Sequence, residues 1–416
     1  MSFPITHKSS VAPVVKRDGD VPLFNISTTS YLVELSVGTP GQSVKVAIDT
    51  GSDELWVDPN CNSRTITETQ SQECEDDGTY DPNNSSTVED LQTTNDITYG
   101  TGQVRIQYVT DNVALPESTI NLTSIQFGVA IADADLNEGI LGLGFGDGKN
   151  LQYKNFVDEL YAQNATQSKA FSVALGGNEF TNAGVIIFGG VDTKKFSGSL
   201  VSNDILAPTA NDINRYSIQL NSVGATIDGK SKTYSGGSTA IVLDTGSSLS
   251  ILPSSVVEGM VEDFDAKLDS DSGLYLVDCS VADQNAMINF AFPGITIHVP
   301  MSEWIFDAGG DTCVLGTQAL DTNSGISALL GDTFLRSAYV VFDQTSNAIL
   351  MAPYENCGKS ETAIPAGAGA AANFTGDCDA SSTNSDSNQN AGSRMGGSAS
   401  ALWAALAVLA SLSLLV

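Results

Sequence analysis

Basic residues and histidines are scarce in this chain of 416 residues. Lysine and arginine total 18 against 49 aspartates and glutamates, which gives a formal net charge of −31 at pH 7. Such a surface repels phosphate backbones, so nucleic acid is a poor partner. The two histidines, His7 and His298, are too few and too scattered for histidine-based catalysis or a zinc site. Carboxylates remain as the abundant reactive groups, and we expect neither a metal nor a cofactor.

The chain also lacks any Cys-x-x-Cys spacing, which makes a metal or redox motif a poor interpretation of its six cysteines. Six cysteines allow fifteen pairings in principle, but here they fall in three locally spaced pairs. Loop length favours the disulfides Cys61–Cys74, Cys279–Cys313 and Cys357–Cys378. Disulfides indicate an oxidising compartment. Asn-x-Ser/Thr sequences point the same way and predict glycosylation at Asn25, Asn84, Asn121, Asn164 and Asn373.

Residues 1–24 contain no apolar run of the kind that begins a secreted protein. Either a signal peptide is missing from this chain or its start is misassigned. The polar segment 1–29 is interpreted as the remnant of a pro-segment, and Lys16-Arg17 as a dibasic processing site. The alternative is a pair of solvated basic residues. Because the strand-like pattern begins only near Tyr31, processing is the favoured interpretation.

The central feature of the chain is a repeated sequence, an apolar strand that ends in Asp-Thr-Gly-Ser. The first begins at Asp49 and the second at Asp244, nearly half the chain apart. Each is followed later by two apolar residues and a glycine, at 140–142 and at 329–331. This pattern is an internal duplication of two lobes rather than a short-period solenoid. We therefore predict an N-terminal lobe over residues 30–205 and a C-terminal lobe over residues 206–357.

Strand patterns dominate both lobes, so the predicted fold class is mostly β. Residues 216–227 resemble a hairpin, and apolar residues at helical spacing predict helices near 156–161 and 256–264. Residues 58–90 are polar and acidic, which predicts a long surface loop. Residues 97–109 are typical of a second hairpin, with its tip at Tyr99-Gly100-Thr101-Gly102.

The composition changes after Cys357. Residues 358–400 are rich in Ser, Gly and Asn without periodicity, which predicts a disordered stalk. Residues 401–416 are an uncharged apolar run, shorter than the roughly 20 residues that span a bilayer comfortably. Small residues and a polar spacer precede this run, as in a glycosylphosphatidylinositol (GPI) attachment signal, with Asn390 the favoured attachment residue. The alternative is a short C-terminal membrane helix.

Two carboxylates that approach one another can share a proton, because like charges close together cannot both ionise cheaply. One can then act as general base on a water while the other donates a proton to a substrate carbonyl. This chemistry needs no metal, nucleophilic side chain or cofactor. The residues that follow each aspartate suit it, since glycine permits a tight turn, threonine can anchor the loop and serine can orient the carboxylate. These supporting residues are Thr50, Gly51, Ser52, Thr245, Gly246 and Ser247.

At this point the chain resembles the pepsin-like aspartic proteases over roughly residues 30–357. The likeness rests on the two Asp-Thr-Gly-Ser segments, the hairpin tip, and segments 139–143 and 330–336. It implies a bilobal pepsin-like fold, in which two pseudo-twofold-related β-barrel-like lobes face each other across an active-site cleft. The tail, the stalk and Lys16-Arg17 are similar to those of the fungal surface subgroup called yapsins, with candidapepsin-like members also similar.

The resemblance implies a role for each matching residue. Asp49 and Asp244 would activate the water, and Tyr99 would close over the substrate with its hydroxyl directed to the Trp56 indole N–H. The other substrate-binding residues implied are Gly100, Thr101, Ile140 and Ser248. Alternatives stay open, since Ile140 and Trp56 are also typical core residues and Tyr99 is also a plausible hairpin residue.

Three departures from the usual family pattern stand out. Asp53-Glu54 follow the first motif, where polar uncharged residues are common. These acids either tune nearby pKa values or face solvent, and we expect them to face solvent. Ser247 replaces the threonine of many members, but it keeps a hydroxyl, so we expect activity to survive. The pro-segment usual in the family is largely absent from this chain.

The sequence therefore predicts an aspartic endopeptidase that cleaves proteins and peptides at acidic pH and is blocked by statine-type inhibitors. We expect a monomer that follows the secretory pathway to the plasma membrane or cell wall. Four acidic residues beside Cys74 favour cleavage next to lysine or arginine if they lie near the cleft, namely Glu73, Glu75, Asp76 and Asp77. Otherwise they belong to a solvated loop of an acidic protein. The rival interpretations are a non-catalytic binding or cell-wall protein on the same scaffold and an inactive decoy. The presence of Asp49, Asp244 and Tyr99 argues against the first.

Overall fold

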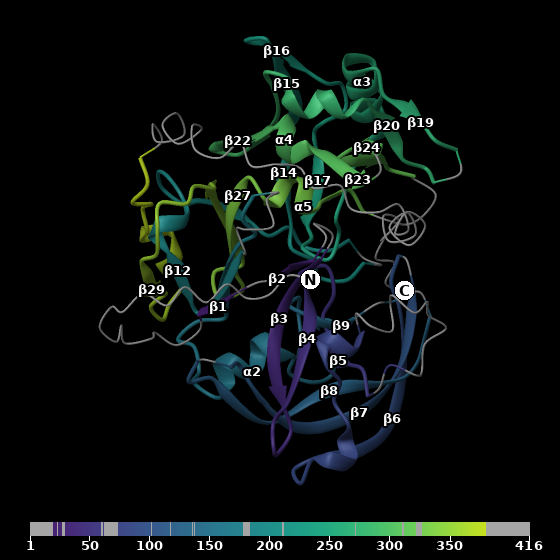
Figure 1. Ribbon diagram of the computed structural model, residues 1–416. Helices are drawn as coiled ribbons and strands as arrows, with labels where there is room; N and C mark the ends of the chain where they lie inside the picture. The colour runs from purple at the N-terminus through teal and green to yellow at the C-terminus, as the bar shows by residue number, and fades with distance from the viewer. Residues whose placement is uncertain are drawn as a thin grey trace, which may run out of the picture.

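In the computed structural model, two lobes built mainly from strands lie one above the other, with a further sheet beside their junction (Figure 1). The mostly β, bilobal prediction is therefore confirmed. The structure describes residues 20–22, 24–26, 30–59, 61, 74–100, 102–116, 118–134, 136, 138–177, 184–209, 212–270, 272–309, 312–321 and 327–379.

The N-terminal lobe contains one sheet with the strand order β2-β3-β4-β9-β5-β8-β7-β6. An additional pairing of β3 with β7 closes this sheet into a barrel. Alternating apolar residues fill the barrel, as in β3, where Val33, Leu35 and Val37 are all buried. Its elements are β2 (Phe24–Ile26), β3 (Ser30–Val37), β4 (Gln42–Asp49), β5 (Leu55–Val57), η1 (Pro82–Asn84), β6 (Glu89–Thr98), β7 (Gln103–Ala114), β8 (Asn121–Ala134), β9 (Gly139–Gly142) and α2 (Phe156–Ala162).

The C-terminal lobe is divided among three smaller sheets of five, four and four strands. The predicted helix is α3, which buries Val256, Val257, Met260 and Phe264 along one face. Its elements are β14 (Ser217–Leu220), β15 (Ser222–Ile227), β16 (Lys230–Thr233), β17 (Thr239–Leu243), β18 (Ser250–Leu252), α3 (Ser254–Phe264), β19 (Lys267–Leu268), β20 (Tyr275–Val277), η3 (Cys279–Asp283), β21 (Ala286–Phe292), β22 (Ile295–Pro300), α4 (Met301–Trp304), β23 (Ile305–Gly309), β24 (Thr312–Leu315), β25 (Thr317–Ala319), β26 (Leu329–Leu330) and α5 (Asp332–Leu335).

The hairpin expected at residues 216–227 is wrong. Strands β14 and β15 are present there, but β14 pairs with β17 and β15 pairs with β16 and β21. The two strands therefore belong to different sheets. Local alternation predicts strands but does not choose their partners, which lie far along the chain.

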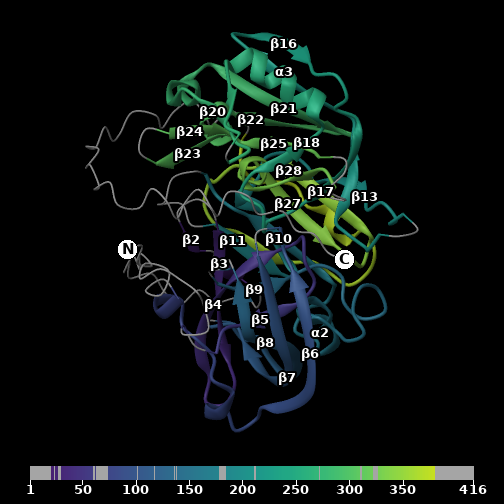
Figure 2. The same ribbon diagram turned by 90° about the vertical axis from the view of Figure 1, so that its right-hand side faces the viewer.

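A separate six-stranded sheet joins the halves of the chain, with neighbouring strands antiparallel and β10 of the first half paired with β27 of the second. Figure 2 shows these strands at a level between the two lobes. Phe171 and Phe342 stack across the join with ring centroids 5.0 Å apart. The sheet and its neighbours comprise β1 (Asp20–Pro22), β10 (Ala170–Ala174), β11 (Val185–Phe188), β12 (Gly190–Asp192), η2 (Thr193–Lys195), β13 (Val201–Asp204), β27 (Ala338–Asp343), β28 (Ala348–Pro353), β29 (Glu361–Ala363) and η4 (Ala370–Asn373).

The internal duplication is visible in the strand pairings around each Asp-Thr-Gly-Ser sequence. In the first lobe β4 runs parallel to β9, and β5 pairs antiparallel with β9 and parallel with β8. In the second lobe β17 runs parallel to β26, and β18 pairs antiparallel with β26 and parallel with β25. The repeated sequence therefore reflects a repeated arrangement of four strands.

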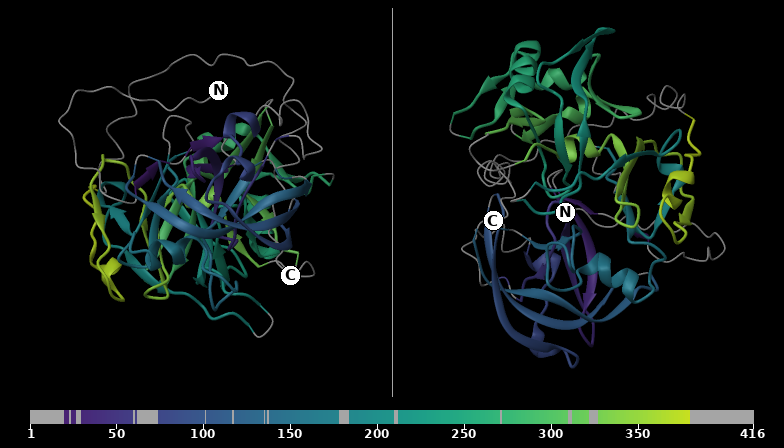
Figure 3. Two further views of the ribbon diagram at one scale, coloured as in Figure 1. Left: turned by 90° about the horizontal axis from the view of Figure 1, so that it is seen from below. Right: turned by 180° about the vertical axis from the view of Figure 1, so that it is seen from behind.

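All three predicted disulfides are present, Cys61–Cys74, Cys279–Cys313 and Cys357–Cys378. The third closes a folded C-terminal segment, residues 355–379, which we call the clasp. Strand β29 of the clasp pairs with β12, and Ile364 and Ala371 are fully buried against Phe196 and Tyr339. Figures 1 and 3 show the clasp at the edge of the molecule farthest from β6.

The expectation of a disordered stalk is therefore wrong for residues 358–379. The clasp has little apolar periodicity, and its order depends on a three-residue strand, one disulfide and backbone bonds to distant residues. For example, the Asp377 N–H donates to the Thr193 carbonyl at 2.7 Å.

Several predicted features lie outside the described residues, namely the remaining stalk (380–400), Asn390, the apolar tail, Thr101 and Lys16-Arg17. None of the helices in the described ranges has both the length and the apolar character that a bilayer-spanning helix needs.

If the clasp is part of the core, a chain ending at Glu355 should be far less stable than one ending at Asp379. Removing the clasp uncovers the side chains that pack against Ile364 and removes both cysteines of the third disulfide, which should lower the free energy of unfolding by about 3 kcal/mol or more. Urea unfolding of the two truncated chains beside the full chain measures this. Equal midpoints for all three would show that the clasp adds nothing to the fold.

Candidate active site

The two motif aspartates lie where parallel strands end, at the junction of the lobes. Asp49 is the last residue of β4, opposite Gly142 of β9, and its carbonyl accepts a 2.8 Å bond from the Leu143 N–H. Asp244 follows β17, and its N–H donates to the Leu330 carbonyl at 3.0 Å. Each aspartate is thus fixed by the apolar-apolar-glycine segment of its own lobe.

Thr50 and Thr245 exchange hydrogen bonds across the junction. The Thr50 N–H donates to Thr245 Oγ1 at 3.1 Å, and the Thr245 N–H donates to Thr50 Oγ1 at 3.0 Å. Each hydroxyl then donates to a backbone carbonyl of the opposite lobe, Thr50 to Leu243 at 2.8 Å and Thr245 to Ile48 at 3.0 Å. These four buried bonds tie together the strand ends that carry the two aspartates.

The carboxylates have matching local partners. Asp49 accepts bonds from the Gly51 N–H at 2.7 Å and from Ser52 Oγ. Asp244 accepts bonds from the Gly246 N–H at 2.9 Å and from Ser247 Oγ at 2.8 Å. The serine that replaces threonine in the second motif thus keeps the expected contact. Two donors on each carboxylate hold its plane in one orientation.

Each motif glycine lies against the carboxylate of the other lobe. A Cβ atom at Gly51 would come within 2.6 Å of Asp244 Oδ1, and one at Gly246 within 2.5 Å of Asp49 Oδ1. Only glycine leaves room for such an approach. The two carboxylates therefore face each other across the junction.

Burial and mutual repulsion act together on this pair. Asp49 and Asp244 are 4% and 1% exposed. Burial, and then the charge of Asp244, raise the pKa of Asp49 well above its ordinary value, although bonds from Ser52 and Gly51 oppose the shift. A pair of this kind can hold one proton between two carboxylates at a pH where isolated aspartates are ionised.

The hairpin β6–β7 carries Tyr99 over an apolar cluster. The Trp56 indole N–H donates to the Tyr99 hydroxyl at 2.9 Å, which is the contact that the family resemblance implied. Trp56 is also fully buried, so packing and hydrogen bonding are not alternatives. Ile140 is half-buried against the same cluster, which includes Trp56 and Tyr99. Burial, followed by the negative charge of Asp49, raises the pKa of Tyr99, which keeps its hydroxyl protonated.

Of the other predicted binding residues, Gly100 is half-buried at the hairpin tip, and Ser248 is buried beside Ser247 with its carbonyl accepting from the Thr333 N–H at 3.2 Å. Within the described ranges, no group of three or more His, Cys, Asp or Glu side chains is arranged to hold a metal ion.

Comparison with known proteins agrees with this geometry. A sequence profile described as "Eukaryotic aspartyl protease" matches residues 30–354. The chain belongs to the eukaryotic aspartyl protease family. It is an aspartic endopeptidase of the pepsin-like type.

Its relatives include fungal and animal enzymes. A "Probable aspartic-type endopeptidase opsB" of Aspergillus oryzae is 33% identical over 381 residues, which are 85% of this chain and 75% of that protein. "Pepsin A" of Sus scrofa is 33% identical over 342 residues, 80% of this chain and 84% of that protein. "Secreted aspartic protease 8" of Candida albicans is 33% identical over 327 residues, 78% of this chain and 75% of that protein.

The expectation that Asp53 and Glu54 of this protease face solvent is wrong. Each is 8% exposed. Asp53 accepts bonds from the Phe145 N–H at 2.6 Å and from Asn150 Nδ2 at 2.9 Å, while Glu54 Oε1 accepts from the Tyr108 hydroxyl at 2.7 Å. Charged residues after a turn are usually solvated, but here the chain leads directly into the buried strand β5. The partners lie 54 to 97 residues away, so no local pattern identifies them.

The structure adds one buried carboxyl to the region of the protease site. Asp332, the first residue of α5, is fully buried, and burial raises its pKa well above the ordinary value, with the charge of Asp244 acting in the same direction. Arg336, one turn later, opposes the shift and binds Glu303, with Nε 3.1 Å from Oε2. The charged residues Asp332 and Arg336 in the otherwise largely apolar segment 329–336 are the sequence signal for this buried cluster.

Buried carboxyl groups predict that the protease loses stability as the pH rises. Burial raises the pKa of Asp49, Asp53, Glu54 and Asp332 above their ordinary values. The native state therefore binds these protons more tightly than the unfolded chain, and the stabilisation present at low pH is lost as the pH rises through the native pKa values. Asp53 alone, with a pKa of about 6 against an ordinary 3.8, accounts for about 2 kcal/mol between pH 4 and 7.

Urea unfolding at pH 4 and pH 7 measures this effect. Asp111 and Asp278 act in the opposite sense, because hydrogen bonds to their carboxylates outweigh burial and lower their pKa values, but they are two groups against the four named above. We expect a lower unfolding midpoint at pH 7. A midpoint that rises from pH 4 to pH 7 would contradict the assignment of raised pKa values.

Proposed function

We propose that this endopeptidase hydrolyses peptide bonds of proteins at acidic pH by means of a water molecule activated between Asp49 and Asp244. The observation that carries the proposal is the approach of each carboxylate to the glycine of the opposite motif. The water would lie between the carboxylates, within reach of both. In this position one group can take a proton from the water while the other gives a proton to the substrate carbonyl.

The shared proton defines the working pH. The pair must hold one proton, because two ionised carboxylates cannot donate and two protonated ones cannot accept. The Gly51 and Gly246 N–H groups and the two serine hydroxyls stabilise the ionised forms, while burial opposes them. The balance keeps a singly protonated pair available in acid, where most exposed carboxylates are losing their charge.

The hairpin β6–β7 is proposed as the flap that covers the substrate. Tyr99 is held by Trp56, and the backbone groups of Gly100 and Thr101 would bind the extended peptide. Ile140 and Ser248 would contact side chains next to the scissile bond. A statine-type inhibitor, which carries a hydroxyl where the attacking water would lie, should compete for the same position.

The most direct mutational test is Asp49→Asn and Asp244→Asn, each nearly isosteric. Either change removes a group that must exchange a proton, so turnover should fall at least about a thousandfold. Initial rates on a peptide library at several pH values measure turnover, and circular dichroism measures folding. Asp111→Asn, a buried carboxylate bonded to Tyr80 and Thr87 away from the motifs, is the matched control and should keep its turnover. Normal turnover in either active-site variant would refute the mechanism.

We also propose a preference for lysine or arginine near the scissile bond. The positions at which the enzyme cleaves the same peptide library measure this preference directly. The support is the excess of acidic residues, including the exposed Glu75 and Asp76. Asp77 is already engaged by Lys45 at 3.3 Å, so it is a weaker candidate. Cleavage without regard to basic residues would remove this part of the proposal.

A secreted, cell-surface location is proposed from the sequence. Its support is the tail at 401–416 with Asn390, the three disulfides, and the exposed side chains of Asn84, Asn121, Asn164 and Asn373. A phosphatidylinositol-specific lipase should release the protein from cells that express the full chain. Detection of residues 401–416 in the mature protein would exclude GPI attachment.

A further inference from the structure

Asp53 is a buried carboxylate for which the proposed mechanism has no use. It directly follows the turn from Asp49 to Ser52 and is 8% exposed. No interaction described for it involves the carboxylate of Asp49 or Asp244. Burying a charge without function or compensation is costly, so its partners indicate what it does.

The carboxylate of Asp53 binds the loop that lies behind the first motif. Oδ1 accepts from the Phe145 N–H at 2.6 Å. A Cβ atom at Gly144 would come within 2.1 Å of the same oxygen, so the loop and the carboxylate are in direct contact. The Gly144 N–H in turn donates to the Ser52 carbonyl at 2.9 Å. Asp53 and Ser52 therefore hold one short segment, residues 144–145, against the catalytic turn.

Asn150 extends this contact to the second lobe. Its Nδ2 group donates both to Asp53 Oδ2 at 2.9 Å and to the Asn214 carbonyl at 2.8 Å. Its Oδ1 atom accepts from the Asn214 N–H at 2.9 Å and from Asn214 Nδ2 at 3.1 Å. Asn214 lies just before β14, the first strand of the C-terminal lobe. The path from Asp53 to Asn214 thus crosses between the lobes through a single amide.

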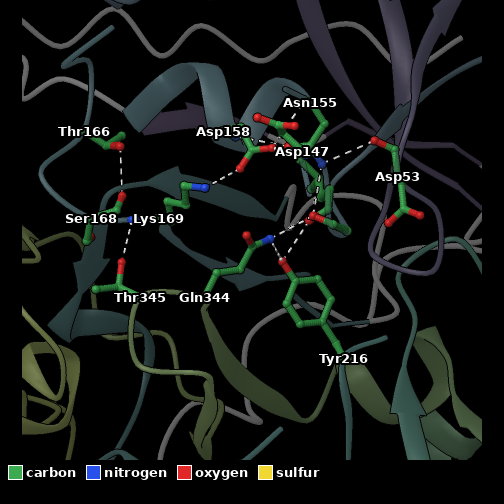
Figure 4. Close-up of polar contacts among 12 residues, drawn as sticks. Asp53, Asp147, Asn155, Asp158, Thr166, Ser168, Lys169, Tyr216, Gln344 and Thr345 are labelled. Carbon is green, nitrogen blue, oxygen red and sulfur yellow. Dashed lines mark hydrogen bonds and ion pairs between the residues drawn. The ribbon is translucent and has the colours of Figure 1, made fainter. Parts of the chain in front are cut away.

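A second path reaches the same loop from the central sheet. Tyr216 donates its hydroxyl to the Leu143 carbonyl at 2.8 Å, and Gln344 Nε2 lies 2.7 Å from that hydroxyl and 2.8 Å from the Gly144 carbonyl. Figure 4 shows Asp53 on one side of this network and Tyr216 with Gln344 on the other. The Leu143 N–H meanwhile binds the Asp49 carbonyl. Segment 143–145 is therefore a second point, besides the Thr50–Thr245 bonds, where the rest of the molecule contacts the strand end of Asp49.

We propose that Asp53 is a positioning residue which, through Asn150 and segment 143–145, sets the Asp49 turn relative to the second lobe and hence to Asp244. The inference rests on the proposed roles of the two aspartates. It predicts that breaking the link shifts one carboxylate with respect to the other without touching the groups that bind substrate.

The polarity of the link explains why an acid is needed. Asp53 meets only donors, the Phe145 N–H and Asn150 Nδ2, and although burial raises its pKa to about 6, these bonds and the positive charge of Arg215 oppose the shift. In acid the protonated carboxyl keeps acceptor capacity on both oxygens, so it can still accept from both donors. An asparagine at this position can satisfy the Phe145 N–H but presents its amide nitrogen to the amide nitrogen of Asn150. A donor facing a donor weakens the link, whereas exchange of the two residues restores one donor and one acceptor.

The test compares Asp53→Asn, Asn150→Asp and the double exchange in the full chain. In Asp53→Asn we expect kcat to fall about tenfold while KM stays within about twofold, because misplacement of reacting groups reduces turnover rather than substrate binding. Asn150→Asp places two carboxylates together and should also lose turnover. The double exchange restores the bond between positions 53 and 150 but loses the donor to the Asn214 carbonyl, so it should recover kcat in part. If Asp53→Asn does not fold, Asn150→Ala cuts the same link and should show the same loss of kcat.

Asp111→Asn again serves as the matched control, since it is a fully buried carboxylate with hydroxyl partners in the N-terminal lobe. It should lower the melting temperature and leave kcat unchanged. If Asp53→Asn behaves like this control, or if the double exchange has no higher kcat than Asp53→Asn alone, the positioning role is wrong. If the unchanged protein cleaves no peptide, the proposed function fails instead, and the two failures are distinct.

Discussion

Four hydrogen bonds hold together the two strand ends that carry the carboxylates. Two join Thr50 and Thr245 to each other, and two run from their hydroxyls to the carbonyls of Leu243 and Ile48. The two carboxylates would repel each other if both were ionised, so something must keep them close. Buried hydrogen bonds can do this, because leaving either hydroxyl or N–H unpaired would cost about 1–3 kcal/mol each. The bonds are symmetric, so each lobe positions the other's aspartate as well as its own.

The duplicated strand arrangement makes this constraint possible. In both lobes the aspartate ends a strand that is parallel to a short apolar strand, and a glycine follows two residues later. Glycine is required because a side chain there would occupy the space of the opposite carboxylate. The six-stranded sheet then joins β10 to β27 and fixes the distance between the halves of the chain. The two aspartates and the strands that support them therefore share the same approximate twofold symmetry.

Much of this was predictable because the signals are local or repeated. The Asp-Thr-Gly-Ser sequences, the Tyr99 hairpin, the two helices and the disulfides all depend on short patterns or close spacing. The errors share a different cause, since they concern partners far away in the sequence. Asp53 and Glu54 are buried by contacts with residues in other elements, β14 and β15 pair with separate sheets, and the clasp gains order from β12 rather than from its own composition. A sequence pattern shows what a segment can form, but distant packing determines what it contacts.

The central claim is that the carboxylates of Asp49 and Asp244, held together at the lobe junction, share a single proton during peptide hydrolysis. The most direct measurement is the pH dependence of kcat/KM for the unchanged protein on one cleavable peptide. Two interacting carboxylates predict a bell-shaped profile with its maximum in acid, whose two limbs report the apparent pKa values of the pair. A profile with a single ionisation that continues to rise through neutral pH would contradict it.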